Sequence, residues 1–140
     1  MSTVTALPSD RTVAILDQAA DYITRHGWIP TSLYQAHRNC PLKCRVHRTG
    51  GYPASMLGAI RVAVFGMPRW YLDTADSEAL HTYTAAVEWL NTYLLAVGHA
   101  RQHACLFDWE TAPERTRADV IAALQYAADA CRTRASRRAA

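Results

Sequence analysis

The 140-residue chain has little of what marks membrane, secreted or nucleotide-dependent proteins. Its apolar runs fall short of the roughly 18 to 20 residues that a membrane-spanning helix needs. The first ten residues, MSTVTALPSD, lack the basic and apolar segments of a secretory signal. The patterns G-x-x-x-x-G-K-[ST], G-x-G-x-x-G, H-E-x-x-H and G-x-S-x-G, typical of nucleotide-binding proteins, zinc proteases and serine hydrolases, do not occur either. These absences predict a cytoplasmic protein without a membrane segment, and they favour a binding protein over an enzyme.

The composition is that of one folded domain. Half of the residues are hydrophobic and 19% are charged. These proportions are typical of a folded protein and not of a disordered one. A chain of this length usually forms a single domain with its own core. We therefore expect residues 1–140 to form one domain, with flexible ends at residues 1–8 and 133–140.

Residues 54–66, ASMLGAIRVAVFG, form the most apolar stretch of the chain, with only Ser55 and Arg61 polar. Glycine or proline residues stand on both sides of the stretch, so the chain can turn sharply at each end. A buried strand would also fit the apolar run, but its length and the helical patterns around it favour a helix. We expect this helix, which Ser55 can cap, to lie at the centre of the fold.

Three other segments carry apolar residues at helical spacing. The first segment ends at Gly27 and the second at Gly98, while the third begins near Thr116 with Asp119 at the capping-box position. Their stripes are Val13, Leu16, Ala20 and Ile23; Leu80, Tyr83, Val87, Leu90, Leu94 and Val97; and Val120, Ala123, Leu124, Ala127 and Cys131. The predicted fold is all-α, a single compact domain of four to five helices. We expect Leu57, Ile60, Val64, Leu90 and Leu124 to be largely buried.

Residues 35–53 are predicted to form a loop insertion, and this insertion contains a candidate zinc site. His37, Cys40, Cys44 and His47 form the pattern H-x2-C-x3-C-x2-H, and thiolate and imidazole are preferred zinc ligands. All four ligands fall within eleven residues, so the chain would have to wrap tightly around the ion. A variant takes two ligands from this loop and two from His99, His103 and Cys105. The alternative interpretation is free thiols and surface histidines.

The charges are separated along the chain into blocks of opposite sign. Residues 22–72 contain seven basic and no acidic residues, whereas residues 73–129 contain nine acidic and three basic ones. A basic block can bind an anionic partner, or the two blocks can face each other across the fold. The residues available for nucleic-acid or partner contact lie in the insertion and in the C-terminal tail: Arg38, Lys43, Arg45, Arg48, Arg134, Arg137 and Arg138. Asp108 and Glu110 are interpreted as charges at a bend.

Four stretches of the chain resemble an uncharacterised family of small proteins from actinobacteria and their phages, a domain of unknown function. The stretches are LDQAADYITRHGW, LGAIRVAV, FDWETAPERT and DVIAALQYAADA. The clearest marks are Gly27-Trp28, Leu57-Gly58-Ala59-Ile60, and Trp109 followed by Arg115-Thr116. The resemblance implies a mostly helical fold and supplies no reaction. A cysteine that often precedes the Leu-Gly-Ala motif in the family is absent here, so the Cys/His loop is a local feature.

Three functions are compatible with these observations. The favoured hypothesis is a non-catalytic accessory or regulatory module that binds another macromolecule, most simply a protein. The first alternative is a nucleic-acid-binding protein that uses the basic insertion 38–48 and the arginine-rich tail. The second is a small metal-dependent enzyme built on the His/Cys set, with zinc as its cofactor.

Overall fold

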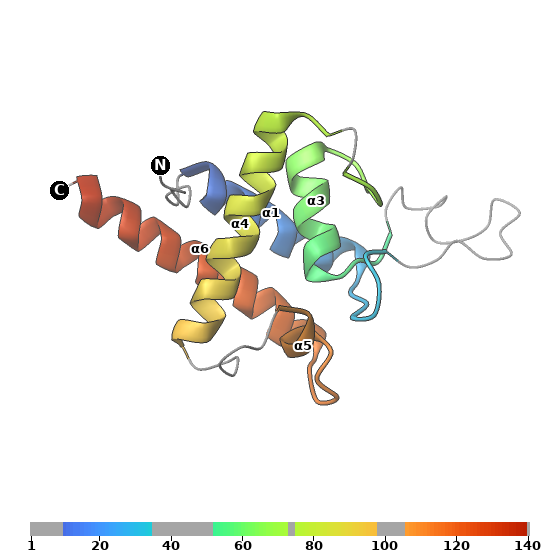
Figure 1. Ribbon diagram of the computed structural model, residues 1–140. Coiled ribbons are helices and arrows are strands. Elements are labelled where there is room, and N and C mark those ends of the chain that lie inside the picture. The colour runs from blue at the N-terminus through green and yellow to red at the C-terminus, as the bar shows by residue number, and fades with distance from the viewer. Residues whose placement is uncertain (1–9, 35–51, 73–74, 98–105, 140) are drawn as a thin grey trace, which may run out of the picture.

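Five helices make up the described part of the chain, which comprises residues 10–34, 52–72, 75–97 and 106–139 of the computed structural model (Figure 1). They are α1 (Asp10–His26), α3 (Met56–Phe65), α4 (Ser77–Ala96), α5 (Leu106–Glu110) and α6 (Arg117–Ala139). These residues contain no strand beyond isolated bridges of Ala54 with Trp28 and Tyr34. The prediction of a single all-α domain is confirmed. Within the described ranges, no helix is long and apolar enough to cross a membrane.

The first helix, α1, forms where the sequence predicts it and buries one face. All four residues of its predicted stripe, Val13, Leu16, Ala20 and Ile23, are buried. Gly27 ends the helix with a backbone φ of 98°, a conformation that glycine adopts without steric cost. Its N–H donates to the carbonyl of Ile23 at 2.9 Å, so one of the last free carbonyls of the helix is satisfied.

The apolar stretch 54–66 forms the helix α3, with both predicted ends in place. Ser55 is the N-cap, and its side chain accepts a hydrogen bond from the N–H of Gly58 at 3.1 Å. Gly66 ends the helix in the left-handed conformation, with a φ of 81°. The first half of α3 is buried except for Leu57, whereas its second half, from Arg61 to Phe65, is half-buried.

The two long helices also carry side-chain caps. Asp76 caps α4 by accepting from the N–H of Ala79 at 3.1 Å. Thr116 and Asp119 form a reciprocal capping box at the start of α6, since each side chain accepts from the other's backbone N–H. At its other end, α6 continues to Ala139, past residue 133, where the sequence predicted a flexible end.

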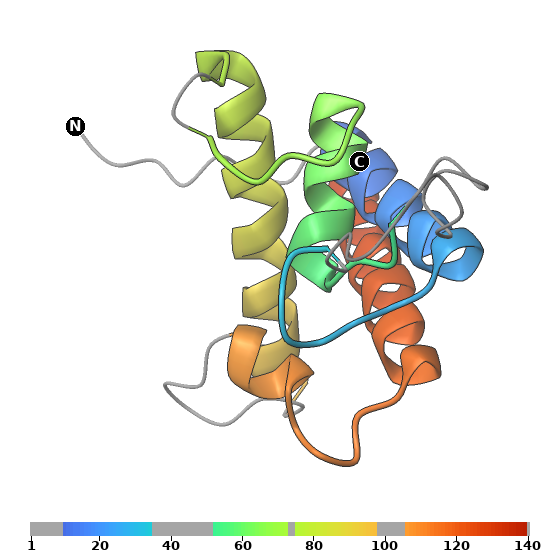
Figure 2. The same cartoon turned by 90° about the vertical axis from the view of Figure 1, so that its right-hand side faces the viewer.

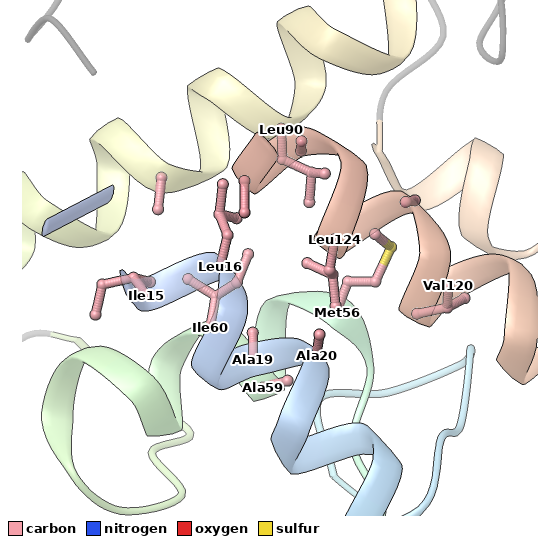
Figure 3. Packing of buried hydrophobic residues seen from close by; sticks show 14 of the residues in the cluster. Ile15, Leu16, Ala19, Ala20, Met56, Ala59, Ile60, Leu90, Val120 and Leu124 are labelled. Atoms are coloured by element: carbon pink, nitrogen blue, oxygen red, sulfur yellow. The ribbon is translucent and has the colours of Figure 1, made fainter. Parts of the chain in front are cut away.

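The helix α1 packs against α3, α4 and α6, and it shares the centre of the domain with the first half of α3 (Figures 1 and 2). The helix α6 runs antiparallel to α1. Near the start of α6, the guanidinium of Arg117 donates to the carbonyl of Ile23 at 3.2 Å. Further along, Arg132 pairs with Asp17 at 2.9 Å. Side chains from α1, α3, α4 and α6 meet in one apolar core (Figure 3).

Three of the five residues predicted to be largely buried are fully buried. Ile60, Leu90 and Leu124 are each 0% exposed. The prediction is wrong for Leu57 and Val64, which are half-buried. Leu57, Arg61 and Val64 are spaced at i, i+4 and i+7, so they share one face of α3. Arg61 holds that face at the rim of the core, because its guanidinium bonds to partners near the surface.

The burial difference within α3 predicts a difference in stability. Ile60→Ala should lower the free energy of unfolding by about 2 to 5 kcal/mol, because it leaves a cavity in the closed core. Val64→Ala, on the half-buried face of the same helix, should cost about 1 kcal/mol or less. Urea denaturation of both variants measures the two costs. Equal losses would contradict the placement of Ile60 in the core.

Candidate functional site

The side chain of Glu110, at the end of α5, is buried and joins three segments of the chain. Its exposed fraction is 3%, which corrects the interpretation of this residue as a charge at a bend. One carboxylate oxygen, Oε2, accepts a hydrogen bond from the indole N–H of Trp28 at 2.7 Å. The same oxygen accepts from the backbone N–H of Met56 at 2.8 Å. Met56 is the first residue of α3, so the carboxylate lies at the positive end of that helix.

Burial raises the pKa of Glu110 to about 7, because the charged form loses its hydration inside the protein. The hydrogen bonds from Trp28 and Met56 act in the opposite direction, since they stabilise the carboxylate. A carboxylic acid that ionises near neutrality is a frequent mark of an active site. Here Oε2 accepts its hydrogen bonds from Trp28 and Met56, which are groups of the protein itself. The arrangement fits a structural role, and we call Glu110 with these two partners the Glu110 junction.

The residues that carry the family resemblance lie in or next to this junction. Trp28 binds Glu110 directly, and Gly58 packs against the chain just before Tyr34. A Cβ added at Gly58 would lie 2.2 Å from the backbone oxygen of Leu33, so only glycine fits there. The guanidinium of Arg115 stacks on the ring of Trp109 at 4.0 Å, and its Nε donates to the carbonyl of Trp109 at 2.8 Å.

A second feature is the first part of the connection between α3 and α4, residues 66–72, which we call the aromatic loop. The buried hydroxyl of Tyr34 accepts from the N–H of Arg69 at 2.9 Å and donates to the carbonyl of Gly58 at 3.2 Å. Burial raises the pKa of Tyr34 to about 12, so this hydroxyl keeps its proton at neutral pH. Arg61 adds two bonds from Nη1, to the carbonyls of Arg69 at 3.2 Å and Trp70 at 3.1 Å.

Three side chains of the aromatic loop are exposed, although its backbone is held at Arg69 and Trp70. Met67 is 61% exposed, Trp70 46% and Tyr71 78%. One edge of Trp70 contacts the buried ring of Tyr34, with the ring centroids 5.1 Å apart and nearly perpendicular. The aromatic loop therefore presents an apolar surface on a fixed backbone. The local sequence shows only that this turn is rich in aromatic residues, because the hydrogen bonds that fix it come from Tyr34 and Arg61, which lie outside it.

Most of the site residues predicted from sequence lie outside the described part of the chain. This applies to the zinc set His37, Cys40, Cys44 and His47, to its variant ligands His99, His103 and Cys105, and to the basic residues Arg38, Lys43, Arg45 and Arg48. Among the residues that are described, no group of three or more His, Cys, Asp or Glu side chains could hold a metal ion. Arg134 and Arg137 are exposed on α6, and Arg138 is described by its backbone alone.

The ion pairs between described residues do not join the two charge blocks. Arg25 pairs with Asp21 within α1. Arg115 lies 3.9 Å from Asp119. Arg132 pairs with Asp17 and with Asp129, and so connects α6 to α1. These contacts stabilise individual helices and the α1–α6 pair. The pairs of Arg25 and Arg132 are exposed, so each contributes little stability, of the order of 0 to 1 kcal/mol.

The chain belongs to a family of unknown function, DUF6197, whose sequence model matches residues 8–130. The resemblance stated from the sequence to a family of unknown function is confirmed. The comparison with curated proteins and the comparison with solved structures each found no match. Because the family has no known function, membership does not identify the function of this chain. A function has to be argued from the residues of the chain itself.

The raised pKa of Glu110 predicts a specific dependence of stability on pH. In the unfolded chain its carboxyl has a pKa near the ordinary value of 4.5, against about 7 in the folded protein. Between these values the folded state retains a proton that the unfolded state has lost, so stability should fall as pH rises. The shift corresponds to at most about 3 kcal/mol, fully lost above pH 7.

Urea denaturation of Glu110→Gln between pH 4.5 and pH 8 isolates this contribution. The amide oxygen can still accept from Trp28 and Met56, but the side chain no longer titrates. The variant should therefore gain stability relative to the wild type as pH rises. Asp108→Asn, an exposed carboxylate two residues away, is the matched control and should keep the wild-type profile. Parallel profiles for wild type and Glu110→Gln would contradict the burial of Glu110.

Proposed function

We propose that this member of the family is a non-catalytic module that acts by binding another protein through the aromatic loop. One observation carries the proposal: Met67, Trp70 and Tyr71 are exposed on a backbone that Tyr34 and Arg61 hold in place. Tryptophan, tyrosine, methionine and arginine are the residue types most enriched in protein–protein interfaces. Their concentration in one segment of seven residues, 66–72, supports a contact surface.

The way in which the loop is fixed favours binding. A flexible loop loses conformational freedom when it binds, and this loss lowers its affinity. In the aromatic loop, the N–H and the carbonyl of Arg69 and the carbonyl of Trp70 already have partners within the protein. Arg61 is itself oriented, because its Nε donates to the hydroxyl of Tyr83 at 3.1 Å. Binding would therefore order few groups that are not ordered in the free protein.

The partner is expected to bury the exposed aromatic surface. Covering an aromatic side chain of this size removes a large apolar area from water, at roughly 25 cal/mol per Å². Trp70 and Tyr71 would be the main anchors, since each combines a large apolar ring with a polar group at its edge. Glu110 is not part of the proposed interface. Its hydrogen bonds to Trp28 and Met56 connect segments inside the domain.

Site-specific photocrosslinking in cells that produce the protein tests this proposal. A photoreactive phenylalanine analogue at position 71 should give a discrete adduct with one protein, because that side chain lies in the proposed interface. The same analogue at Tyr126, which is 57% exposed on α6, is the matched control and should not give that adduct. Trp70→Ala should abolish the adduct while far-UV circular dichroism still shows a folded protein. Identical adducts from both positions, or an adduct that survives Trp70→Ala, would contradict the proposal.

A second candidate function is binding to nucleic acid, and the shape of α6 favours it. The helix continues to Ala139, and Arg134 and Arg137 are exposed near its end. Positions 134, 137 and 138 are spaced at i, i+3 and i+4, which places them on one side of the helix. The guanidinium of Arg134 lies over the ring of Trp89, 5.8 Å from its centroid. Phosphate contacts from such a surface would be independent of base sequence.

Fluorescence anisotropy with duplex and single-stranded DNA at two salt concentrations tests this second function. Affinity should fall steeply with salt, because each neutralised phosphate releases condensed counterions. Replacing Arg134 and Arg137 by glutamine should weaken binding to all sequences alike and flatten the salt slope by about one unit per lost contact. Arg25→Gln, which removes an exposed arginine paired with Asp21, is the control. Absence of binding at low micromolar protein and moderate salt would exclude this function.

A further inference from the structure

A pocket of about 250 Å³ lies where the connection from α5 to α6 meets the first half of α6. Its walls are made by described residues of both segments: Trp109, Arg115, Asp119, Ala122, Ala123 and Tyr126. None of them belongs to the aromatic loop, so this pocket is a separate feature of the molecule. Its volume is below the usual range for drug-sized ligands, about 300 to 1,000 Å³, and suits a smaller molecule.

One end of the pocket carries a fixed positive charge. The guanidinium carbon of Arg115 lies over the ring of Trp109, 4.0 Å from its centroid, and Nε of Arg115 donates to the backbone carbonyl of Trp109. The Arg115 side chain is only 19% exposed. An arginine held in this way keeps its planar pair of terminal nitrogens in one orientation, which suits a carboxylate.

A negative charge stands beside it. Oδ2 of Asp119 accepts from the N–H of Thr116 at 3.0 Å, so the capping box fixes this carboxylate. The distance from Oδ2 to Nη1 of Arg115 is 3.9 Å, longer than a hydrogen bond. Both charges therefore border the same pocket without a close bond between them. A ligand that carries only one charge would be attracted by one of these groups and repelled by the other.

The remaining walls are apolar. Asp119, Ala122, Ala123 and Tyr126 follow the spacing i, i+3, i+4 and i+7, so they form one stripe along α6. The two alanines leave room over the helix, and Tyr126, with 57% of its surface exposed, stands at the far end of the stripe. Ala123 is only 3% exposed, so an apolar side chain laid along this stripe would contact chiefly the methyl group of Ala122 and the ring of Tyr126.

We propose that this pocket binds a free α-amino acid with an aromatic or large aliphatic side chain. The α-carboxylate pairs with Arg115, the α-ammonium group pairs with Asp119, and the side chain lies over Ala122 and Ala123 against Tyr126. The zwitterion fits because its ammonium and carboxylate groups are attached to the same carbon atom, and the two charged groups of the pocket are also close together, with Nη1 of Arg115 3.9 Å from Oδ2 of Asp119. The affinity expected for a ligand of this size in an open pocket is a Kd of the order of 1 mM.

Titration of the isotope-labelled protein with L-phenylalanine, followed by amide NMR, tests the proposal. L-phenylalanine should shift the amide signals of residues 115–126 in a saturable manner. N-acetyl-L-phenylalanine lacks the positive charge and L-phenylalaninamide lacks the negative one, so each should bind at least about tenfold more weakly. Equal binding of the three compounds, or no shift of these signals up to about 20 mM L-phenylalanine, would overturn the proposal.

Three variants locate the site. Asp119→Asn removes the charge while its amide oxygen can still accept from Thr116, and it should weaken L-phenylalanine binding about tenfold. Ala122→Leu fills the floor of the pocket with a good helix former and should abolish binding. Tyr71→Ser changes the aromatic loop and should leave the Kd for L-phenylalanine unchanged. Amino-acid binding to the pocket and protein binding to the aromatic loop can therefore be tested, and can fail, separately. Wild-type affinity in Asp119→Asn would also overturn the proposal.

Discussion

The hydrogen bonds of the Glu110 carboxylate connect three parts of the chain that are far apart in the sequence. Trp28 follows α1, Met56 begins α3, and Glu110 ends α5. One oxygen atom of Glu110, Oε2, accepts hydrogen bonds from both Trp28 and Met56. An unpaired N–H at the start of a buried helix is costly, as is a buried carboxylate without partners. The hydrogen bond between Met56 and Glu110 gives the N–H an acceptor and the carboxylate a donor. The start of α3 and the end of α5 therefore stabilise each other.

The segments beside this junction are fixed by a small set of backbone contacts. Ala54 exchanges hydrogen bonds with Gly27 and Ile29, and the N–H of Ser55 donates to the carbonyl of Leu33 at 3.0 Å. The close approach at Leu33 requires glycine at position 58. From this frame the hydroxyl of Tyr34 reaches the aromatic loop. The exposed surface proposed for binding is thus connected to the buried junction through a chain of direct contacts, and its rigidity derives from the core.

The sequence predicted the elements of this fold well and their connections poorly. Helix caps and stops such as Ser55 and Gly66 act within a few residues, so the local pattern reveals them. Glu110 was misinterpreted because its partner Trp28 lies 82 positions away in the sequence, and no local pattern distinguishes a buried carboxylate from a solvated one. Burial of Val64 was overestimated for a related reason: apolar character alone does not say which face of α3 meets another helix.

The two proposed binding features differ in how they relate to the family. Trp109 and Arg115, which carry part of the family resemblance, are also walls of the pocket on α6. The aromatic loop shares none of the residues that carry the resemblance. The residues that carry the resemblance therefore include Trp28, which binds Glu110, and Arg115, at the charged end of the pocket. The family model covers the pocket and the aromatic loop alike, since both lie within residues 8–130, so family membership does not decide between the two proposed features.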